Sequence, residues 1–324
     1  MQISAQELLL HPRFSEALER ASQVVRRGLE GEALILPLFG PTRVGKTELI
    51  KTLVMDHPPS TMEGRRTMPV LRVTTPVSPT RRSLPEALLG ALDPRKYGRC
   101  SADQITRRAE GLLKLAGTRV IIFDEIQHFV ERASSRAARE AADWMKVLGE
   151  NLSLTILMVG LPSAQEILNR NEQLRDRAEA PYWFYPYSWN KPNERAEFEA
   201  TLAALCRVLV QAGWQVPDAC SPDLVRRAYA ASLGRVGMLI KLFVSAEAAS
   251  KSARLDMPLL RRAYVDSVGT QLIADNPFDP AAAVNDSVLV QGYVKLLDEA
   301  RMPVPSNRHR RVSSKTASVA EASL

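Results

Sequence analysis

The sequence predicts an α/β fold: a mostly parallel sheet covered by helices, followed by an all-helical part. Up to about residue 190, short apolar segments of strand character alternate with segments of helical periodicity. This alternation is typical of crossover units, which place successive strands in parallel. Beyond residue 190 the pattern is that of amphipathic helices. We therefore expect a sheet domain first and a helical domain after it.

The expected strands are short runs of apolar, often branched residues, as the buried strands of a parallel sheet require. They are residues 32–40, 68–75, 118–125, 152–160 and 180–187. The expected helices of this part are residues 3–30, 47–57, two segments opening at Ser83 and Ser101, and 135–150. Ser83 with Glu86, and Ser101 with Gln104, have the spacing of a capping box.

The second part contains five helical segments and a polar end. Ser221 is the expected N-cap of one helix, with Pro222 at its first position. The other expected helices are residues 192–213, 237–253 and 257–269. A proline-marked segment at 275–280 leads to a further helix at 289–300, and the polar end, 303–324, is predicted to be disordered. The expected division is a helical segment (1–30), an α/β domain (31–190), a helical domain (191–272) and a C-terminal extension (273–324).

Composition and charge narrow the possible classes of protein. The 324 residues are 45% hydrophobic and 24% charged, which is ordinary for a globular protein. No apolar run approaches the roughly 20 residues that span a bilayer, and the N-terminus lacks the order of a signal peptide. We expect a cytoplasmic protein with no membrane partner. The net charge of +7 permits nucleic-acid binding without requiring it.

The stretch "GPTRVGKT" carries the first chemical motif. Gly40, Gly45, Lys46 and Thr47 satisfy the phosphate-loop pattern, with an expected strand before them and a helix after them. The glycines let backbone N–H groups close around phosphate, Lys46 reaches the outer phosphates, and the Thr47 hydroxyl can bind Mg²⁺. The predicted nucleotide-binding residues are Gly40, Pro41, Thr42, Arg43, Val44, Gly45, Lys46 and Thr47.

A second motif completes the expected site. The apolar run 120–123 ends in Asp124 and Glu125. Strand ends of a parallel sheet meet at one edge, so these carboxylates should lie near the phosphate loop. Asp124 is the predicted magnesium ligand, and Glu125 the predicted base that activates a water molecule.

The nucleotide is predicted to be ATP rather than GTP. The stretch "NKPN" at 190–193 resembles a guanine-reading pattern, but Asn193 stands where that pattern has the aspartate that pairs with guanine. The stretch also lies beside the expected helical part rather than at a strand end, where that pattern occurs.

Because it carries both motifs, the chain resembles the AAA+ ATPases. Among them it is most similar to the TniB/TnsC transposition-regulator ATPases of Tn7-like and related elements. The similarity covers roughly residues 10–270. It rests on "DEIQHFVER" (124–132), "LMVGLPSAQEIL" (157–168), "NEQLRDRAEA" (171–180) and "ASLGRVGMLIKLFVSAEAA" (231–249). Secretion-type and replication-initiator ATPases share much of this pattern.

The resemblance implies a P-loop AAA+ sheet domain with a C-terminal helical lid, forming a homo-oligomeric ring or helical filament around double-stranded DNA. It implies ATP and Mg²⁺ as cofactors. A transposase and a target-selecting protein are the implied partners. ATP would favour assembly on target DNA, and hydrolysis would dismantle the assembly. The alternative is a nucleotide-switched secretion or signalling ATPase without a DNA role.

The resemblance also implies roles for residues outside the two motifs. Arg177, or else Arg175, matches the arginine finger, which reaches the phosphate of a neighbouring subunit. Arg235 matches the start of the helix that carries sensor 2, although an arginine here can also be a capping residue. The sensor 1 position has Gly160 and Leu161, so sensor 1 is unassigned. Ser163 has capping-box spacing and is expected to be an N-cap.

Basic residues between the second and third expected strands are candidates for DNA contact. The resemblance implies that this face lines the DNA channel, and the alternative is a solvated helix face. The candidates are Arg81, Arg82, Lys96, Arg99, Arg107 and Arg108. Arg308, Arg310 and Arg311 of the tail are further candidates. The aromatic stretch 182–189 is expected to be core rather than a base-stacking surface.

Overall fold

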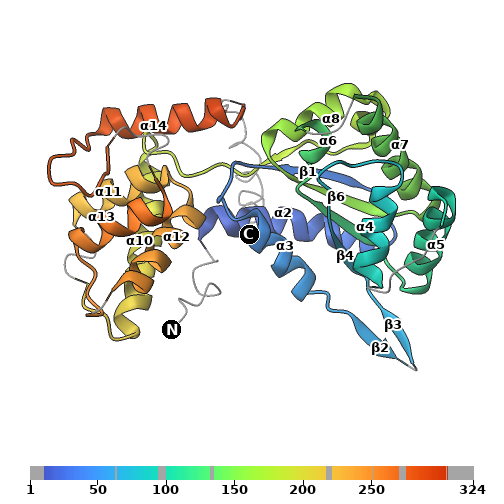
Figure 1. The fold of residues 1–324 in the computed structure, drawn as a ribbon, viewed down its shortest axis with the longest axis horizontal. Helices are drawn as coiled ribbons and strands as arrows, with labels where there is room; N and C mark the ends of the chain where they lie inside the picture. The colour runs from blue at the N-terminus through green and yellow to red at the C-terminus, as the bar shows by residue number, and fades with distance from the viewer. Residues whose placement is uncertain are drawn as a thin grey trace, which may run out of the picture.

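The computed structural model describes residues 11–62, 64–93, 100–131, 135–216, 221–250, 252–269, 275–303 and 305. Its centre is a five-stranded sheet with the order β4-β5-β6-β1-β7, in which every pairing is parallel (Figure 1). The strands are β1 (Ile35–Phe39), β4 (Val70–Thr74), β5 (Val120–Asp124), β6 (Thr155–Gly160) and β7 (Tyr182–Trp183). The predicted fold class, a parallel sheet domain followed by helices, is confirmed.

Alternating side chains on the strands build a separate core on each face of the sheet. Leu36 and Leu38 of β1 pack with one set of helices, whereas Ile35 and Phe39 pack with the other. The first face is covered by α2 (Pro12–Leu29) and α3 (Lys46–Met55). The opposite face is covered by α4 (Ser83–Leu92), α5 (Ala102–Leu115), α6 (His128–Glu131), α7 (Ser135–Leu152), α8 (Gln165–Arg170) and α9 (Glu172–Arg177). The result is a three-layer α/β/α domain.

All five strands are shorter than expected, and the local structure gives the reason for two of them, β6 and β7. Helix α7 continues to Leu152, and Ser153 turns in the left-handed region at φ 49°, so β6 begins only at Thr155. Strand β7 covers only Tyr182–Trp183, because the chain then leaves the sheet: Phe184 packs against the phosphate loop and Tyr187 enters the helical core. The expectation that the aromatic stretch is core is confirmed for Phe184, Tyr187 and Trp189, which are buried, whereas Tyr182, Trp183 and Tyr185 are only half-buried.

Helix starts test the capping expectations. Ser101 and Gln104 form the predicted capping box. At α4 the prediction is wrong: the helix begins at Ser83 itself, whose hydroxyl accepts from the Thr80 N–H at 2.8 Å. Ser163 is likewise not an N-cap, because residues Pro162–Ala164 form a short 3-10 helix ahead of α8.

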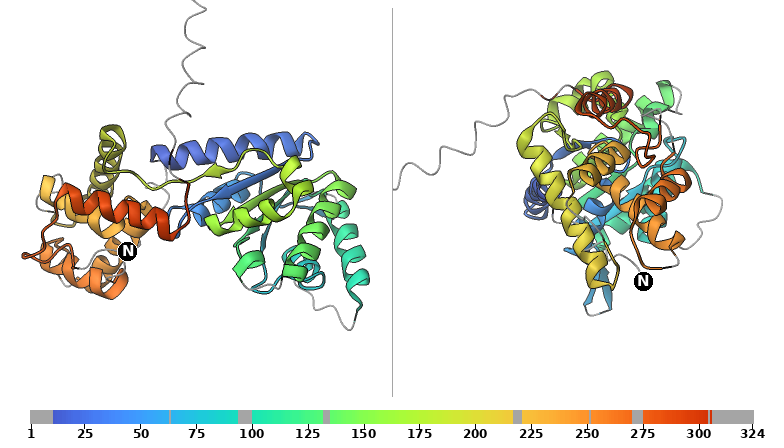
Figure 2. Two further views of the ribbon diagram at one scale, coloured as in Figure 1. Left: turned by 90° about the horizontal axis from the view of Figure 1, so that it is seen from above. Right: turned by 90° about the vertical axis from the view of Figure 1, so that its left-hand side faces the viewer.

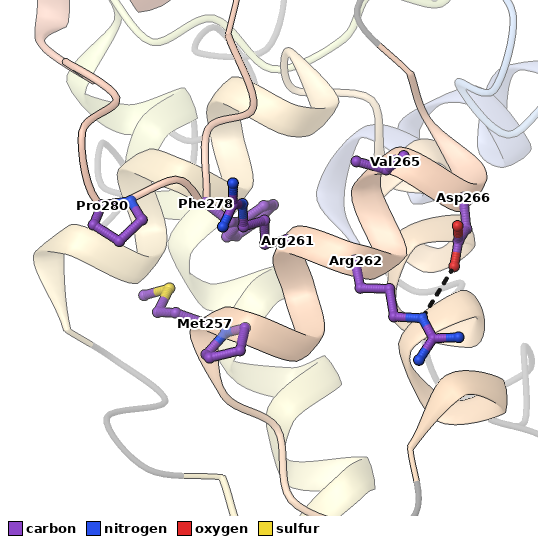
Figure 3. Close-up of a pocket in the computed structure, with 8 residues that line it drawn as sticks. Met257, Arg261, Arg262, Val265, Asp266, Phe278 and Pro280 are labelled. Atoms are coloured by element: carbon purple, nitrogen blue, oxygen red, sulfur yellow. Dashed lines mark ion pairs between the residues drawn. The ribbon is translucent and has the colours of Figure 1, made fainter.

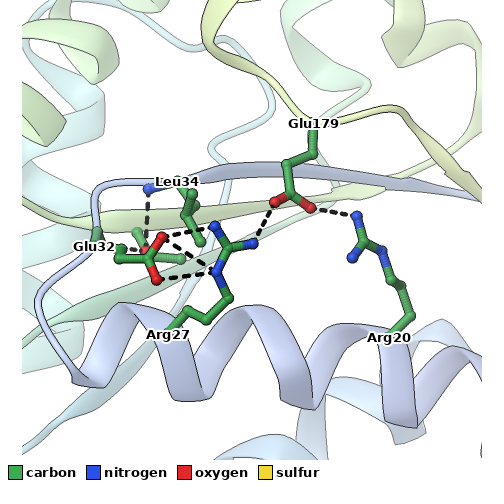
Figure 4. A network of polar contacts seen from close by, with 6 residues as sticks. Arg20, Arg27, Glu32, Leu34 and Glu179 are labelled. Atoms are coloured by element: carbon green, nitrogen blue, oxygen red, sulfur yellow. Dashed lines mark hydrogen bonds and ion pairs between the residues drawn. The ribbon is translucent and has the colours of Figure 1, made fainter.

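The N-terminal helix α2 starts at Pro12, with His11 as its N-cap; the expected part before residue 11 lies outside the described residues. Figure 4 shows how its outer side is fixed. Arg20 and Arg27 both bind the carboxylate of Glu179, and Arg27 also binds Glu32 at 2.6 Å. This network links α2 to the segment that directly follows α9.

One feature of the sheet domain has no counterpart among the sequence-based expectations. Strands β2 (Ser60–Met62) and β3 (Arg65–Thr67) form an antiparallel hairpin between α3 and β4. It projects away from the body of the domain (Figure 1). Its three-residue strands carry too little apolar residue pattern to be recognised in a sequence.

The second part is a helical lid with its own core, which runs from Tyr187 to Leu289 (Figure 2). Ser221 caps α11 as predicted. Among the described residues no single helix is long and apolar enough to cross a membrane; α11 and α12 pass that test only together, as a pair bent by 108°. The helices are α10 (Pro192–Gln211), α11 (Pro222–Ser232), α12 (Val236–Ala249), α13 (Met257–Ser267) and α14 (Asp286–Glu299).

A cavity of about 430 Å³ lies in the lid beside α13 (Figure 3). Its walls include Met257 and Val265 of α13 and Phe278 and Pro280 from the segment before α14. None of its lining residues belongs to the phosphate loop or to the strand ends. The cavity therefore belongs to the lid and not to the predicted nucleotide site.

Candidate functional site

The strand register brings the two sequence motifs to one edge of the sheet. Strand β6 pairs with β1 on one side and with β5 on the other. The N–H of Gly40, just after β1, donates to the Gly160 carbonyl at 3.2 Å, and the N–H of Ile126, just after β5, donates to the Val159 carbonyl at 3.1 Å. The phosphate loop and the Asp124-Glu125 pair thus leave the sheet on either side of the same strand.

The phosphate loop turns sharply, with positive φ angles at Gly45 and Arg43. Gly45 has φ 123° and is the N-cap of α3, so the loop enters the helix directly. Arg43 has φ 64°, a left-handed conformation that is strained for a side chain of this type. At Gly40, a Cβ atom would stand 2.7 Å from the Phe184 carbonyl oxygen. Within the loop Pro41 and Val44 are buried, while Thr42, Arg43 and Thr47 are exposed.

Lys46 folds back onto the loop. Its Nζ donates to the carbonyl of Gly40 at 2.7 Å and to that of Pro41 at 2.8 Å. Burial lowers the pKa of Lys46 to about 8, and the carboxylates of Glu125 and Asp124 oppose this shift. The lysine is therefore a partly buried cation whose hydrogen bonds go to neutral carbonyls.

Asp124 ends strand β5 as a buried carboxylate. Its Oδ2 accepts from Arg72 Nη2 at 2.6 Å, and its Oδ1 accepts from the Glu125 N–H at 2.9 Å. Arg72 comes from the neighbouring strand β4, where Thr74 pairs with Asp124 in the ladder. The sequence reasoning did not single out Arg72; its only signal was a charged residue inside an otherwise apolar strand.

Glu125 turns out of the strand with φ 57°, and its side chain is exposed at the edge. Its Oε2 accepts a hydrogen bond from the side-chain amide of Gln127, a residue only 3% exposed. The other end of that amide, Oε1, accepts from the Leu161 N–H at 3.0 Å. Gln127 is a second residue that the motif search missed.

The lid meets the phosphate loop through close backbone packing. A Cβ atom at Gly237, in the first turn of α12, would stand 2.5 Å from the Arg43 carbonyl oxygen. Gly234, at φ 75°, lies against the backbone of Tyr187, where a Cβ atom would approach the carbonyl oxygen to 2.0 Å. Only glycine fits at these two positions, so they set the approach of α12 to the loop.

The start of α2 joins the same region. The ring of Phe14 lies 3.6 Å from the position of a Cβ atom on Gly45. His11 Nδ1 is 2.9 Å from the hydroxyl of Tyr187, and burial lowers the pKa of His11 to about 4. Arg13 pairs with Glu194 of α10 at 2.5 Å. Helix α2 thus contacts both the loop and the segment that leads into the lid.

Arg235, the predicted sensor 2 residue, is the N-cap of α12 and is 6% exposed. Its Nε donates to the Ser232 carbonyl at 2.9 Å, and burial lowers its pKa to about 10, with Tyr264 opposing the shift. These contacts match the capping alternative. A contact from Arg235 to nucleotide remains a prediction.

The two candidates for the arginine finger, Arg175 and Arg177, lie in the last turn of α9 and are exposed on the surface. Arg177 is 54% exposed and pairs with Glu150 of α7 at 2.5 Å. Arg175 is 52% exposed and its nearest acids are Glu172 and Asp176. Both side chains are therefore accessible to another subunit.

Four of the six DNA candidates lie in the described residues, and all four are exposed. Arg81 pairs with Asp103 at 3.1 Å, and Arg82 pairs with Glu86 at 2.8 Å. Arg107 and Arg108 lie on α5, which packs beside α4 at the β4 side of the sheet. Lys96, Arg99 and the tail arginines Arg308, Arg310 and Arg311 lie outside the described residues.

The residues present fit a nucleotide with magnesium. The start of α3 presents backbone N–H groups without intrahelical partners, and Lys46 adds a cation whose hydrogen bonds go to the neutral carbonyls of Gly40 and Pro41. Thr47 and Asp124 offer oxygen ligands, and Mg²⁺ characteristically takes one or two protein oxygens together with phosphate and water. No cluster of three or more His, Cys, Asp or Glu that could hold a metal by itself occurs in the described part of the chain.

The lowered pKa of Lys46 predicts that nucleotide binding takes up protons at alkaline pH. At pH 8.5 much of Lys46 is neutral in the empty loop, because its pKa is about 8. A polyphosphate favours the charged lysine and raises its pKa, so protons must be bound along with it. Calorimetry of ATP binding at pH 8.5, in two buffers of different ionisation enthalpy, measures this uptake. Lys51→Met should leave the uptake unchanged; proton release, or none exchanged, would contradict the prediction.

The fold is similar to several solved structures of low sequence identity. A Walker-type ATPase of Pyrococcus abyssi, PABY2304, is 17% identical with a TM-score of 0.53, over 76% of this chain and 71% of that one. The Aeropyrum pernix ORC2 protein, solved in ADPNP–ADP complexes, is 16% identical with a TM-score of 0.57, over 92% and 83%. The A. pernix ORC1 protein in complex with DNA is 18% identical with a TM-score of 0.55, over 80% and 68%.

These similarities establish the fold alone: a parallel sheet covered by helices on both faces, with a helical region after it. No curated protein matches the chain. The family model described as Bacterial TniB protein matches residues 1–184, more than half of the 324 residues, and this range contains the phosphate loop, Asp124, Glu125 and Arg177. The chain belongs to the family of bacterial TniB proteins.

Proposed function

We propose that this protein is an ATPase that regulates transposition: it assembles with ATP on double-stranded target DNA, recruits or activates a transposase, and leaves the DNA after hydrolysis. The observation that carries the proposal is the meeting of Lys46, Asp124 and Glu125 at one sheet edge, in a chain of the TniB family. A lysine, a metal ligand and a base at one place are what phosphoryl transfer to water needs.

Within this proposal, each loop residue has a definite task. Backbone N–H groups of residues 42–47, which include the start of α3, surround the phosphates, and Lys46 exchanges its carbonyl partners for phosphate oxygens. Mg²⁺, held at Thr47 and Asp124, would neutralise phosphate charge. Arg72 already pairs with Asp124. To hold the metal, the carboxylate of Asp124 must either give up this ion pair or bind Arg72 and Mg²⁺ at the same time.

DNA binding is proposed for the exposed arginines at the β4 side of the sheet. The acids that pair with Arg81 and Arg82 are themselves exposed, and exposed ion pairs contribute little stability; Arg82 also donates to the Cys100 carbonyl at 2.9 Å. These arginines are thus readily available to phosphate groups. The net charge of +7 acts in the same direction. The similar fold of an ORC1 protein solved in complex with DNA supports the proposal by analogy.

Assembly is proposed because Arg177, which matches the arginine finger, is exposed at the end of α9 and accessible to another subunit. In a ring or filament, Arg177 would leave Glu150 and reach the phosphate of the adjacent subunit. A target-selecting protein and the transposase complete the proposed partners, and the cytoplasm is the proposed location because target DNA lies there. If DNA does not bind and does not change the rate of ATP hydrolysis, the alternative function is a signalling or secretion ATPase without a DNA role.

Arg177→Ala should keep the ATP affinity of the single subunit and lose assembly-dependent hydrolysis, since a finger acts only across an interface. Phosphate release is measured for the variant alone and after mixing with Lys46→Ala, whose own loop is disabled but whose finger is intact. Mixing should restore turnover at the interfaces that combine the two. Arg170→Ala, an exposed arginine on α8 that pairs with Glu166, is the matched control. Full turnover by Arg177→Ala alone would exclude this residue as the finger.

The double variant Arg81→Ala, Arg82→Ala should weaken duplex binding equally on unrelated sequences and leave ATP affinity unchanged. Each lost phosphate contact should reduce the slope of log affinity against log salt by about one unit. The measurement is a titration of labelled duplexes at several salt concentrations, with and without ATP. Arg261→Ala with Arg262→Ala is the matched control, because these exposed lid arginines also pair with acids. An unchanged slope in the Arg81/Arg82 variant would place the DNA surface elsewhere.

A further inference from the structure

The buried amide of Gln127 connects the end of strand β6 to the carboxylate of Glu125. Its Oε1 accepts from the Leu161 N–H at 3.0 Å, and its Nε2 donates to Glu125 Oε2. Only 3% of the residue is exposed, so the amide has little freedom to exchange these partners for water. Both hydrogen-bonding ends of the amide are therefore committed, one to the sheet and one to Glu125.

The end of β6 is built to admit this amide. A Cβ atom at Gly160 would stand 2.5 Å from Gln127 Oε1 and 2.8 Å from Ile126 Cγ2. Any larger residue at 160 would displace the amide or the adjoining backbone. The strand end offers no polar side chain at Gly160, Leu161 or Pro162. The polar group at this point is instead supplied from the segment after β5.

We propose that Gln127 is the positioning residue for Glu125. The proposal rests on the function proposed above, hydrolysis of ATP with Glu125 as base. The backbone of Glu125 lies in the left-handed region and its side chain is exposed. Because Glu125 belongs to neither β5 nor α6, regular secondary structure does little to fix its carboxylate. The amide of Gln127 supplies that restraint.

The restraint has a direct use in the reaction. The amide occupies Oε2 of Glu125, and no hydrogen bond to Oε1 occurs among the described residues. Oε1 is thus the oxygen that takes the proton from water. The water oxygen forms the new bond to the γ-phosphorus, the bond from that phosphorus to the bridging oxygen breaks, and its electron pair leaves with ADP. Gln127 itself touches neither water nor phosphate.

Two substitutions separate positioning from a structural role. Gln127→Glu keeps the shape and the acceptor for the Leu161 N–H, but it replaces the donor to Glu125 with an oxygen. Gln127→Met has similar size and removes both hydrogen bonds. Gln291→Glu, on the exposed side of α14, makes the same chemical change far from the loop in the sequence and is the control. Glu125→Gln is the reference for complete loss of the base.

The experiment measures the kcat and KM of ATP hydrolysis, the affinity for a non-hydrolysable ATP analogue and the melting temperature of each variant. We expect Gln127→Glu to lower kcat tenfold or more, within the roughly 10²–10⁴-fold that a general base contributes. Because Gln127→Glu buries a second carboxylate beside Glu125, its melting temperature should fall, while its analogue affinity should fall much less than its kcat. Gln127→Met should lower kcat similarly and should also lower the melting temperature, because the Leu161 N–H loses its partner.

A third variant tests the same geometry from the other side. Gly160→Ala leaves Gln127 intact but puts a methyl group where the amide oxygen lies, so it should also lower kcat. Combined with Gln127→Met, it should add little further loss of kcat, since the positioned amide is already gone.

The outcomes for Gln127 and for the proposed function are distinct. If the wild type hydrolyses ATP and Glu125→Gln does not, but Gln127→Glu turns over at the wild-type rate, Gln127 has only a structural role and the proposal is overturned. If analogue affinity falls as much as kcat, Gln127 acts on binding and the proposal is again overturned. If the wild type itself does not hydrolyse ATP, or Glu125→Gln is fully active, the proposed function fails and the role of Gln127 fails with it.

Discussion

The parallel pairing of β6 between β1 and β5 is the constraint on which the rest of the site depends. The register sets Phe39 opposite Gly160 and Phe123 opposite Met158, so the ends of β1 and β5 lie within one residue of each other along β6. The phosphate loop and the two carboxylates are held by this pairing, and so is Gln127 through the Leu161 N–H. A shift of one residue in the register would turn the strand side chains to the opposite face and separate these groups.

Close backbone packing then joins the other elements to this edge. Gly40, Gly45 and Gly237 allow Phe184, Phe14 and the start of α12, respectively, to approach the loop. The lid, the start of α2 and the segment after β7 therefore all reach one short stretch of backbone. A change of loop shape on nucleotide binding would act on each of them directly, which gives the proposed assembly a physical route from nucleotide to subunit surface.

The sequence carried the motifs because their chemistry is local. The phosphate loop and the Asp124-Glu125 pair are contiguous patterns, each beside an apolar run. The capping boxes show that a local pattern can also give a wrong prediction. Ser101 caps a helix as its spacing suggests, but Ser83 and Ser163 have the same spacing and do not, because nearby turns decide where those helices begin. Arg72 and Gln127 could not be predicted: their roles come from strand pairing and from a glycine in another segment. Nor could the approach of Gly237 to Arg43, which joins residues far apart in the chain.

The central claim is that duplex DNA stimulates ATP hydrolysis at this edge of the sheet. It is tested most directly by the rate of phosphate release from the wild-type protein in low salt, with and without duplex DNA, over a range of protein concentrations. The account predicts a rate per subunit that rises with protein concentration and rises further when duplex of any sequence is added. A rate that is the same with and without duplex at every concentration would contradict it.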